Sequence, residues 1–401
     1  MTPVFCCGFE CGRIGGVPVG QSAIHWQTGG ASASISTTTV RSGARSGRLN
    51  MTGVGTNINT TIASTNLLVA RFFVYFATLP NITCLVAGAV FSTTAGVYFN
   101  VSDSSLYAGT GSTGSIALGA TGVPIATNRW YCIDIRMDCS NNPRLIDTRV
   151  DGVALGQKSL AVASASATSF KFGSDESATY DAFYDDVVLS VTTGDYPIGP
   201  GYVHHFVPTS DGTHNIAGAA DFKRGAAGVD ILNATTDSYL LVDDVPMDDA
   251  TPDTDDYINA IAPANATDYT ENKFGPAPSI PTPVVAPRAV DAIVAYHQAG
   301  TGAGTSQFRL NDNGTEDTIV SLNGIGVITL RYSRKQYATM PGGGGAWTVA
   351  RFNDLRIRFG FSSDANPDQY FDCAMIEAEF AHPPLQIVAI TKPSRNRAAT
   401  V

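Results

Sequence analysis

The chain has 401 residues, of which 44% are apolar and 9% aromatic, enough to build the cores of two domains. Only 15% of the residues are charged and the net charge is −10, so neither half of the chain is basic enough to bind along a nucleic acid. No apolar stretch is long enough to span a membrane, because the best one, 67–79, is short and contains Arg71.

The cysteines are concentrated at the start of the sequence, where Cys6, Cys7 and Cys11 account for three of the seven. This start lacks the charged and apolar regions of a signal peptide, so we expect synthesis in the cytoplasm and reduced, mostly buried thiols. No CxxC spacing and no matching histidine motif supports a zinc site among them.

Short runs rich in Val, Ile, Thr, Phe and Tyr fill the first half of the chain and alternate with Gly, Asn, Asp and Ser, as in antiparallel β-structure. The run 67–78 is apolar on both faces, so we expect it at the centre of a sheet. Asp151-Gly152 is a two-residue hairpin signal. Segments 31–39 and 161–169, rich in Ser, Thr and Ala, are expected as edge strands. The strands predicted in this half are 67–78, 83–91, 96–101, 130–137, 144–150, 153–157 and 180–191.

The second half repeats this pattern. Thr348 is a candidate N-cap for a single helical turn. The segment 276–287 contains five prolines, and we expect it to be a long loop inside the second domain, since strands before it need partners after it. The strands predicted here are 290–297, 306–311, 326–333, 355–362 and 370–380.

Many short strands without intervening helices exclude parallel α/β folds and predict an all-β chain. We predict two antiparallel β-sandwich domains of the jelly-roll, concanavalin A-like type in tandem. The first covers 1–208 and the second 209–383, and a basic tail at 384–401 follows.

Three segments together resemble the LamG-like, concanavalin A-like jelly rolls of tailed-phage virion proteins. The first is Gly8-Phe9-Glu10, followed by Trp26 and the run RSGARSGRLN at 41–50. The other two are NRWYCIDIRM with NPRLIDTRVDGVALG, within 128–156, and FYDDVVLSVTTGDYPIGPGYVHHFVPTSDGT at 183–213. The segments 243–260 and 345–362 look like the second domain that often follows in those proteins.

The resemblance implies a structural component of a tailed bacteriophage virion: a tail, fibre or capsid-decorating protein made in the host cytoplasm. Such a protein acts through protein–protein contacts and is not an enzyme. We expect it to bind copies of itself, with a trimer favoured, and other virion proteins. The alternative is a glycan-binding module for attachment to the host surface.

One candidate metal site is the pair Asp185-Asp186 at the head of a predicted strand. Carboxylates are calcium ligands, and concanavalin A-like relatives often hold Ca²⁺, but the pair is also suited to capping a turn through backbone N–H groups. No other cofactor is expected.

The run 243–256 holds seven aspartates, including Asp248 and Asp249, without the spacing of an EF-hand. It is expected either as a solvated acidic loop or as a face that meets a basic neighbour. In the second case the acidic run would bind Lys392, Arg395 and Arg397 in the tail of another copy. The alternative for that tail is a solvated terminus.

Trp26 and Trp347 are candidates for stacking on a sugar, with core packing as the alternative for each. Asp134 with Asp138, and Glu377 with Glu379, share a strand face, but the Glu-x-Asp-x-x-Glu pattern of the related glucanases is absent. We expect these four carboxylates to face solvent. His204 and His205 point to opposite faces of a strand, which makes a poor metal site.

Overall fold

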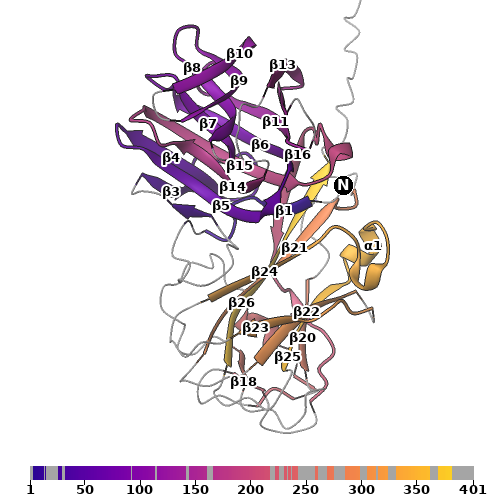
Figure 1. The fold of residues 1–401 in the computed structure, drawn as a ribbon. Coiled ribbons are helices and arrows are strands. Elements are labelled where there is room, and N and C mark those ends of the chain that lie inside the picture. Colours follow the sequence, from indigo (N-terminus) through magenta and orange to yellow (C-terminus); the bar gives the residue numbers. More distant parts are fainter. Residues whose placement is uncertain are drawn as a thin grey trace, which may run out of the picture.

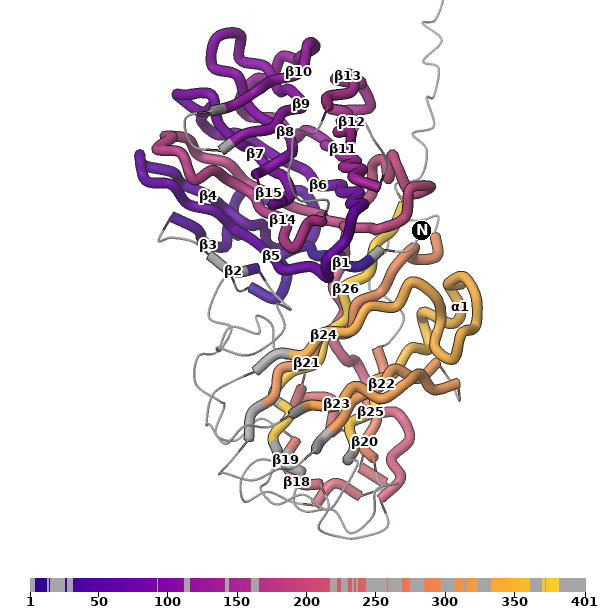
Figure 2. Tube along the Cα trace, in the orientation of Figure 1, coloured from indigo at the N-terminus to yellow at the C-terminus, as the bar shows by residue number. Residues whose placement is uncertain are grey.

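Strands dominate the structure, a computed structural model, and they form four antiparallel sheets arranged as two sandwiches (Figures 1 and 2). The prediction of an all-β chain built from two antiparallel β-sandwich domains is therefore confirmed. The residues that the structure describes are 3–12, 14, 26–28, 32–91, 93–112, 115–140, 144–159, 166–216, 222–224, 230–232, 234–235, 237–242, 258–260, 269–274, 285–298, 305–312, 315–323, 331–361 and 369–381.

The first sandwich contains strands β1 to β15. Sheet A has the order β13-β12-β11-β6-β15-β4-β3, with β1 paired to β15, and sheet B has the order β10-β9-β8-β7-β14-β5-β2. The bounds are β1 Pro3–Cys7, β2 Gln27–Thr28, β3 Ala33–Ser36, β4 Ser46–Thr52, β5 Thr56–Thr65, β6 Leu67–Thr78, β7 Cys84–Val90, β8 Thr94–Asn100, β9 Ser105–Ser112, β10 Ser115–Pro124, β11 Trp130–Asp138, β12 Leu145–Val150, β13 Val153–Ser159, β14 Ala167–Ser174 and β15 Thr179–Ser190.

Strand β6 lies at the centre of sheet A, between β11 and β15, as its two-sided apolar pattern predicts. Leu68, Phe72 and Val74 face the core of the first sandwich. Val69 and Arg71 alternate with them on the opposite face, and both are fully buried. Both faces are covered because sheet A packs against sheet B on one side and against the second sandwich on the other (Figure 1).

The hairpin predicted at Asp151-Gly152 joins β12 to β13. Both residues have positive φ angles, 50° and 82°, which is the geometry of a type I′ turn and explains the Asp-Gly sequence.

Two Ser/Thr/Ala-rich segments were candidates for edge strands. Within 31–39, β3 is indeed the edge strand of sheet A. Within 161–169, residues 161–165 lie outside the described part, and β14 begins at Ala167. The edge position is wrong for β14, which lies between β7 and β5 because Phe170 and Phe172 anchor it in the core.

The second sandwich contains strands β16 to β26. Sheet C has the order β18-β19-β26-β21-β24, with β16 paired to β26, and sheet D has the order β17-β20-β25-β22-β23. The bounds are β16 Gly201–Phe206, β17 Ser210–Asp211, β18 Phe222–Arg224, β19 Ile258–Ala260, β20 Tyr269–Lys273, β21 Ala289–Gln298, β22 Thr305–Asp312, β23 Val320–Asn323, β24 Arg331–Tyr337, β25 Leu355–Phe361 and β26 Gln369–Ala381; the short helices are η1 Thr193–Asp195, η2 Ser238–Leu241, η3 Pro341–Gly343 and α1 Val349–Phe352.

By strand pairing, the change from one sandwich to the other falls between the end of β15 at Ser190 and the start of β16 at Gly201. The boundary expected at 208 therefore lies one strand later than the pairing places it. Most of the proline-rich segment 276–287 lies outside the described residues, but β20 before it and β21 after it both belong to the second sandwich.

Helix α1 is the single helical turn predicted after Thr348. The Oγ1 of this residue accepts a hydrogen bond from the Arg351 backbone N–H at 3.3 Å, which is the interaction of an N-cap. The N-cap prediction is therefore confirmed.

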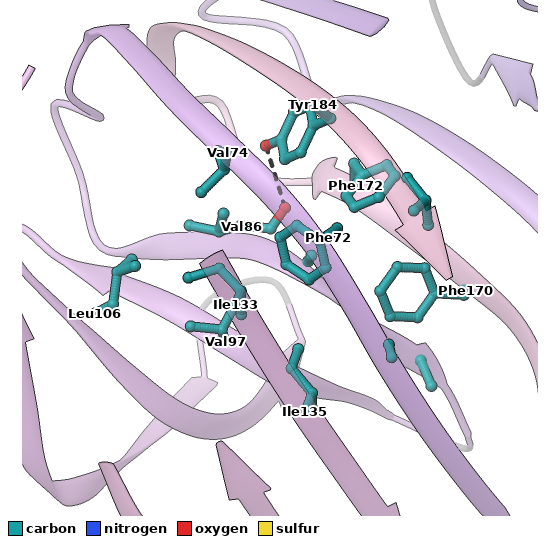
Figure 3. Close-up of a cluster of buried hydrophobic side chains, with 14 of the residues drawn as sticks. Phe72, Val74, Val86, Val97, Leu106, Ile133, Ile135, Phe170, Phe172 and Tyr184 are labelled. Carbon is teal, nitrogen blue, oxygen red and sulfur yellow. Dashed lines mark hydrogen bonds between the residues drawn. The ribbon is translucent and has the colours of Figure 1, made fainter. Parts of the chain in front are cut away.

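The core of the first sandwich is an aliphatic and aromatic layer between sheets A and B (Figure 3). Phe72 of β6 contacts Phe172 of β14 edge to face, with ring centroids 5.1 Å apart. Tyr184 of β15 donates its hydroxyl proton to the carbonyl oxygen of Val86 in β7 at 3.2 Å, so one polar bond also joins the two sheets.

Candidate functional site

A junction between the sandwiches holds several buried charged side chains, and β1 lies inside it. Phe5 and Cys7 enter the core of the first sandwich, whereas Cys6 between them points to the opposite face. Beyond the strand, Cys11 packs with Ile293 of the second sandwich. The alternation of side chains thus lets a single segment contact both sandwiches.

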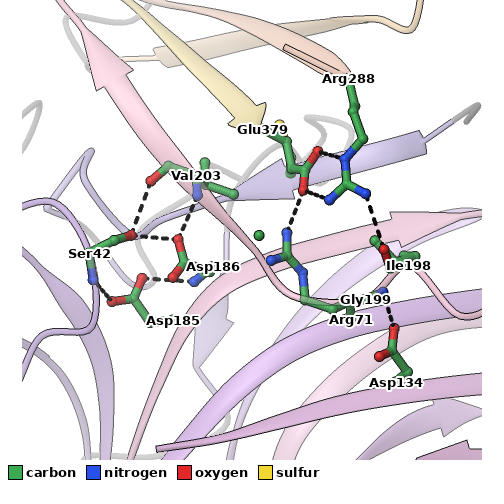
Figure 4. A network of polar contacts seen from close by, with 12 residues as sticks. Ser42, Arg71, Asp134, Asp185, Asp186, Ile198, Gly199, Val203, Arg288 and Glu379 are labelled. Carbon is green, nitrogen blue, oxygen red and sulfur yellow. Dashed lines mark hydrogen bonds and ion pairs between the residues drawn. The ribbon is translucent and has the colours of Figure 1, made fainter. Parts of the chain in front are cut away.

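The first group of charges in the junction is centred on Glu379 of β26 (Figure 4). Arg71 of β6 donates from Nη2 to Oε1 of Glu379 at 2.9 Å, and neither side chain is exposed. Arg288, which precedes β21, donates from Nε to Oε2 at 2.6 Å and from Nη1 to the carbonyl oxygen of Ile198 at 3.1 Å. Both carboxylate oxygens are therefore paired, which offsets the cost of burying the charge.

The second group holds β1 on the second sandwich. Arg334 of β24 donates from Nε to Asp291 at 2.7 Å and from Nη2 to Glu377 at 3.2 Å. The same carboxylates accept the backbone N–H groups of Cys6 at 3.1 Å and Gly8 at 3.2 Å. Burial raises the pKa of Glu377 to about 7, since Arg334 offsets only part of the desolvation.

Glu10 makes a third connection. Its Oε1 accepts the backbone N–H groups of Ala44 at 2.9 Å and Arg45 at 3.1 Å, and its Oε2 lies 3.2 Å from Nδ1 of His205 in β16. Burial raises the pKa of Glu10 to about 7 and lowers that of His205 to about 4. Both groups are thus shifted toward their neutral forms.

The pair Asp185-Asp186 forms a clamp between the sandwiches. Asp185 accepts the backbone N–H groups of Arg41 at 2.9 Å and Ser42 at 3.3 Å. Asp186 accepts the Ser42 hydroxyl at 2.6 Å and the Val203 backbone N–H at 2.5 Å, and pairs with the Arg41 guanidinium. Burial, reinforced by Asp186, raises the pKa of Asp185 well above its usual range.

The calcium prediction for Asp185 and Asp186 stays a prediction, but their contacts differ from those of a calcium site. Calcium requires oxygen ligands, whereas these carboxylates are surrounded by N–H and O–H donors and an arginine. Among the described residues no group of three or more His, Cys, Asp or Glu side chains is placed to hold a metal ion. The turn-capping alternative is the one that the contacts fit.

The expectation that Asp134, Glu377 and Glu379 face solvent is wrong. Glu377 and Glu379 are fully buried and Asp134 is 3% exposed. Asp134 accepts the backbone N–H of Gly199 at 3.1 Å, in the segment that leads into β16. Asp138 remains partly exposed. The shared faces were predicted correctly, but the face of β26 that carries the two glutamates packs against the other sandwich instead of water.

Sequence reasoning also missed the ion pairs of the junction. Arg71 and Asp291 each interrupt an otherwise apolar strand, and that position was the available signal. A charge on a strand with two apolar faces is a buried charge, and a buried charge requires a partner elsewhere in the fold.

Trp26 and Trp347 are buried, with 1% and 5% of their surface exposed, so neither ring is placed to stack on a sugar. Trp26 stacks on Phe9 at a centroid distance of 5.4 Å and also contacts Phe172 at 4.9 Å. Trp347 donates its indole N–H to the carbonyl oxygen of Tyr337 at 3.1 Å. Core packing, the alternative given for each, fits these contacts.

A small depression, with room for about 20 Å³, lies on the outer face of sheet B, away from the junction. Lys171 of β14 donates to Asp175 at 2.6 Å on one side of it, and Asn57 of β5 donates to the same carboxylate at 3.0 Å. Leu85 of β7 and Tyr98 of β8 also line the depression, and both are buried. The depression thus combines charged, amide and apolar groups.

The remaining site predictions fall outside the described residues. Asp248 and Asp249 lie in the acidic run, and Lys392, Arg395 and Arg397 lie in the basic tail, so the structure does not test an inter-subunit contact between them. His204 and His205 lie on β16 with ring centroids 5.6 Å apart. In the described part of the chain no helix is long and apolar enough to cross a membrane.

No family model matches the sequence. No curated protein matches it either. Among solved structures, the cellulose-induced protein Cip1 is 13% identical with a TM-score of 0.34, over 47% of this chain and 97% of its own. Domain 4 of AbnA, an extracellular arabinanase from Geobacillus stearothermophilus, is 14% identical with a TM-score of 0.33, over 47% and 91% of the two chains.

A tandem of two CBM22 domains from Paenibacillus barcinonensis Xyn10C covers 94% of this chain and 97% of its own, at 8% identity and a TM-score of 0.27. Sequence identities and TM-scores this low do not indicate what this chain does. The function must be inferred from the geometry of its own residues.

Proposed function

We propose that this chain is a structural component of a tailed-phage virion that acts through protein–protein contacts. The observation that carries the proposal is the filled junction: Glu379 pairs with buried Arg71 and with partly exposed Arg288, and the pair with Arg71 crosses between the two sandwiches. Such a junction makes the sandwiches one rigid unit, because separating them would leave unpaired charges on the face of each sandwich. A rigid unit holds its outer surfaces at a constant spacing, as a part of a regular particle must.

The same junction argues against a catalytic role. Glycoside hydrolysis requires two carboxyl groups on either side of a bound substrate. The same-face pair Glu377 and Glu379 is covered by the other sandwich, and arginines neutralise it. Asp134 is turned into the junction as well. These acids therefore stabilise the fold and have no access to a substrate.

Self-association is part of the proposal. Closed symmetry is the usual outcome for identical chains, and a trimer is the state that the resemblance to phage fibre and decoration proteins favours. Light scattering coupled to gel filtration measures this directly. A mass of three chains supports the trimer, and a monomer at all concentrations contradicts it.

The experiment that tests the main proposal is to locate the chain in particles. Antiserum against the recombinant protein is used for immunogold electron microscopy of phage purified on a density gradient, together with mass spectrometry of the same fractions. We expect regular labelling at one position on the particle and a constant copy number. Recovery of the chain only in the soluble lysate would overturn the proposal.

The second function that we propose, as the alternative to the first, is the binding of a host-surface glycan. Because Trp26 and Trp347 are buried, a glycan would have to bind at other residues. A glycan array probed with the intact chain tests it, and no signal on any glycan would remove it. The two functions are compatible, because an exposed virion protein can also contact the host.

A further inference from the structure

We propose that a row of side chains on the outer face of sheet A binds a neutral glycan chain, with the ring of Trp130 as the surface on which a sugar stacks. This inference rests on the second function above and assigns residues to it. The chain has three tryptophans, and Trp130 is half-buried whereas Trp26 and Trp347 are buried. Trp130 is therefore the tryptophan whose surface a ligand can reach.

The row crosses four neighbouring strands in one register. Trp130 of β11 is paired with Tyr75 of β6, Tyr75 with Phe183 of β15, and Phe183 with Arg48 of β4. Each of the four has a direct sequence neighbour in the core of the first sandwich, so all four side chains lie on the outer face of sheet A. Side chains directly opposite each other on adjacent strands are close enough to touch, so they form one continuous surface.

This end of sheet A is open, whereas the other end is covered. On the same face of β6, Val69 packs with Val203 of the second sandwich, and Arg71 pairs with Glu379. Tyr75 lies further along the strand and is half-buried, which leaves part of its ring exposed. The row therefore borders the junction without being part of it.

The aromatic part of the row has a fixed geometry. The ring centroids of Trp130 and Tyr75 are 5.5 Å apart, and the two rings are inclined by 51°. Phe183 contacts Tyr75 edge to face at 5.9 Å and is itself buried, with the Arg48 guanidinium over its ring at 5.4 Å. Phe183 thus supports Tyr75 from below, and the two half-buried rings present rigid apolar surface to the C–H faces of neighbouring sugar rings.

Polar groups flank the rings on both sides and are held in place before any ligand binds. On one side, the Tyr75 hydroxyl donates to Oδ1 of Asn128 at 3.0 Å, and the Asn128 backbone N–H donates to the carbonyl oxygen of Phe76 at 2.8 Å. On the other side, Arg48 donates from Nε and Nη2 to the two carboxylate oxygens of Asp181, each at 2.9 Å. Ordering these groups therefore costs little when a ligand binds.

The chemistry of the row selects a neutral ligand. Arg48 and Asp181 neutralise each other, and their side chains are 37% and 19% exposed, so a donor and an acceptor are accessible side by side. A sugar hydroxyl both donates and accepts, so it can bond to both members of such a pair. Asn128 offers a further amide donor and acceptor on the far side of the rings.

The length of the row sets the length of the ligand. Adjacent strands lie about 4.8 Å apart, so a row across four strands is about 14 Å long. That length exceeds one sugar ring and suits a short segment of a glycan chain. The rest of the glycan can remain in solvent, because the row lies on an open sheet face.

The test uses the intact chain on an array of bacterial surface glycans, followed by titration of maltohexaose, cellohexaose and chitohexaose under tryptophan fluorescence. Trp130→Leu keeps apolar volume but removes the ring, and Asp181→Asn breaks the charged pair. Because each variant loses a stacked ring or a charge-assisted hydrogen bond, we expect each to weaken binding about tenfold. Trp130→Tyr keeps a ring, so it should still bind while the fluorescence change on binding disappears.

The matched control is Tyr107→Leu, which removes a half-buried ring from the outer face of sheet B. Thermal unfolding and circular dichroism show that each variant is folded. Weakened binding by Trp130→Leu and Asp181→Asn, with unchanged binding by Tyr107→Leu, supports the site. Full binding by Trp130→Leu would overturn the site while leaving glycan binding elsewhere on the chain.

Absence of glycan binding by the unaltered chain would overturn both the site and the second function, and the virion proposal would still stand on its own test. Aromatic and arginine side chains also occur at contacts between proteins. If the unaltered chain binds no glycan and Trp130→Leu lowers the mass measured by light scattering, the row contacts another copy of the chain instead of a sugar.

Discussion

Arg71 and Glu379 form a fully buried ion pair across two sandwiches, although 308 positions separate them in the chain. One residue belongs to the central strand of sheet A and the other to β26 in sheet C. Each charge interrupts an apolar strand, and each is tolerated because the other lies 2.9 Å away. The stability of the junction therefore depends on keeping both charges.

Replacing Glu379 tests this dependence. Glu379→Ala leaves Arg71 and Arg288 facing a buried gap, so we expect the free energy of unfolding to fall by about 3–5 kcal/mol. Urea unfolding followed by circular dichroism measures the change. The control is Asp230→Ala, which breaks a pair with Lys223 whose side chains are 37% and 30% exposed, and should cost less than about 1 kcal/mol. Equal effects of the two variants would contradict the importance of the junction.

Glu377 should make the junction sensitive to pH. Its pKa in the folded chain, about 7, lies above the ordinary value of 4.5, because burial favours the protonated form. The folded state therefore binds the proton more tightly than the unfolded state. The stability that this group contributes is fully present below pH 4.5 and is lost as the pH rises through 7.

The variant Glu377→Gln isolates this effect, because glutamine resembles the protonated acid at every pH. Relative to the unaltered chain, the variant should gain stability between pH 5 and pH 8. The comparison with the unaltered chain is needed because His205 is present in both proteins. Its lowered pKa makes the stability of each protein fall as the pH drops below 6.5, which is opposite to the effect of Glu377. Denaturant midpoints at several pH values check the prediction, and a constant difference between the two proteins would refute it.

The two buried tryptophans should contribute to stability and have no part in sugar binding. Trp26→Ala and Trp347→Ala each remove a large core side chain, so we expect losses of about 3–5 kcal/mol. Any glycan affinity should be unchanged when measured well below the melting temperature of the variant. Native tryptophan emission at short wavelength, shifting to the red on unfolding, would confirm that the rings are buried.

Calcium should not change the stability of the clamp at Asp185 and Asp186, because N–H and O–H donors already bind these carboxylates. Melting temperatures measured with EDTA and with millimolar CaCl₂ should agree. Asp186→Ala, in contrast, removes the partner of Arg41 and Ser42 and should destabilise the chain by about 3–5 kcal/mol. A melting temperature that rises with calcium and saturates would show that the clamp binds the ion.

Much of the fold follows from the period-two pattern of the sequence. The run 67–78 coincides with β6, and the runs 130–137 and 355–362 match β11 and β25 to within one residue at each end. These strands are recognisable because each carries β-branched and aromatic residues and ends at a turn. The helical turn after Thr348 is equally local, since its N-cap is three residues from the group that it binds.

The candidate sites were less predictable, because burial depends on partners that are distant in sequence. Glu377 and Glu379 alternate with apolar residues as a solvent-facing pair would, and nothing nearby reveals that a second sandwich covers them. Lys171 and Asp175 are four positions apart, yet the depression beside them depends on strands β7 and β8. Pairing between sheets is a long-range property, so a single sequence seldom discloses it.

The position of β1 has a consequence for how the chain matures. Cys6 and Glu377 are 371 positions apart, so during synthesis the ribosome releases β1 long before β26 exists. The first sandwich can form around Phe5 and Cys7, but the face of β1 that carries Cys6 stays uncovered until β26 has been synthesised. During that interval the thiol of Cys6 and the backbone N–H of Gly8 are open to solvent, chaperones and oxidants. Protection of that thiol from alkylation would therefore be a late event, and its timing would report when β26 has packed against β1.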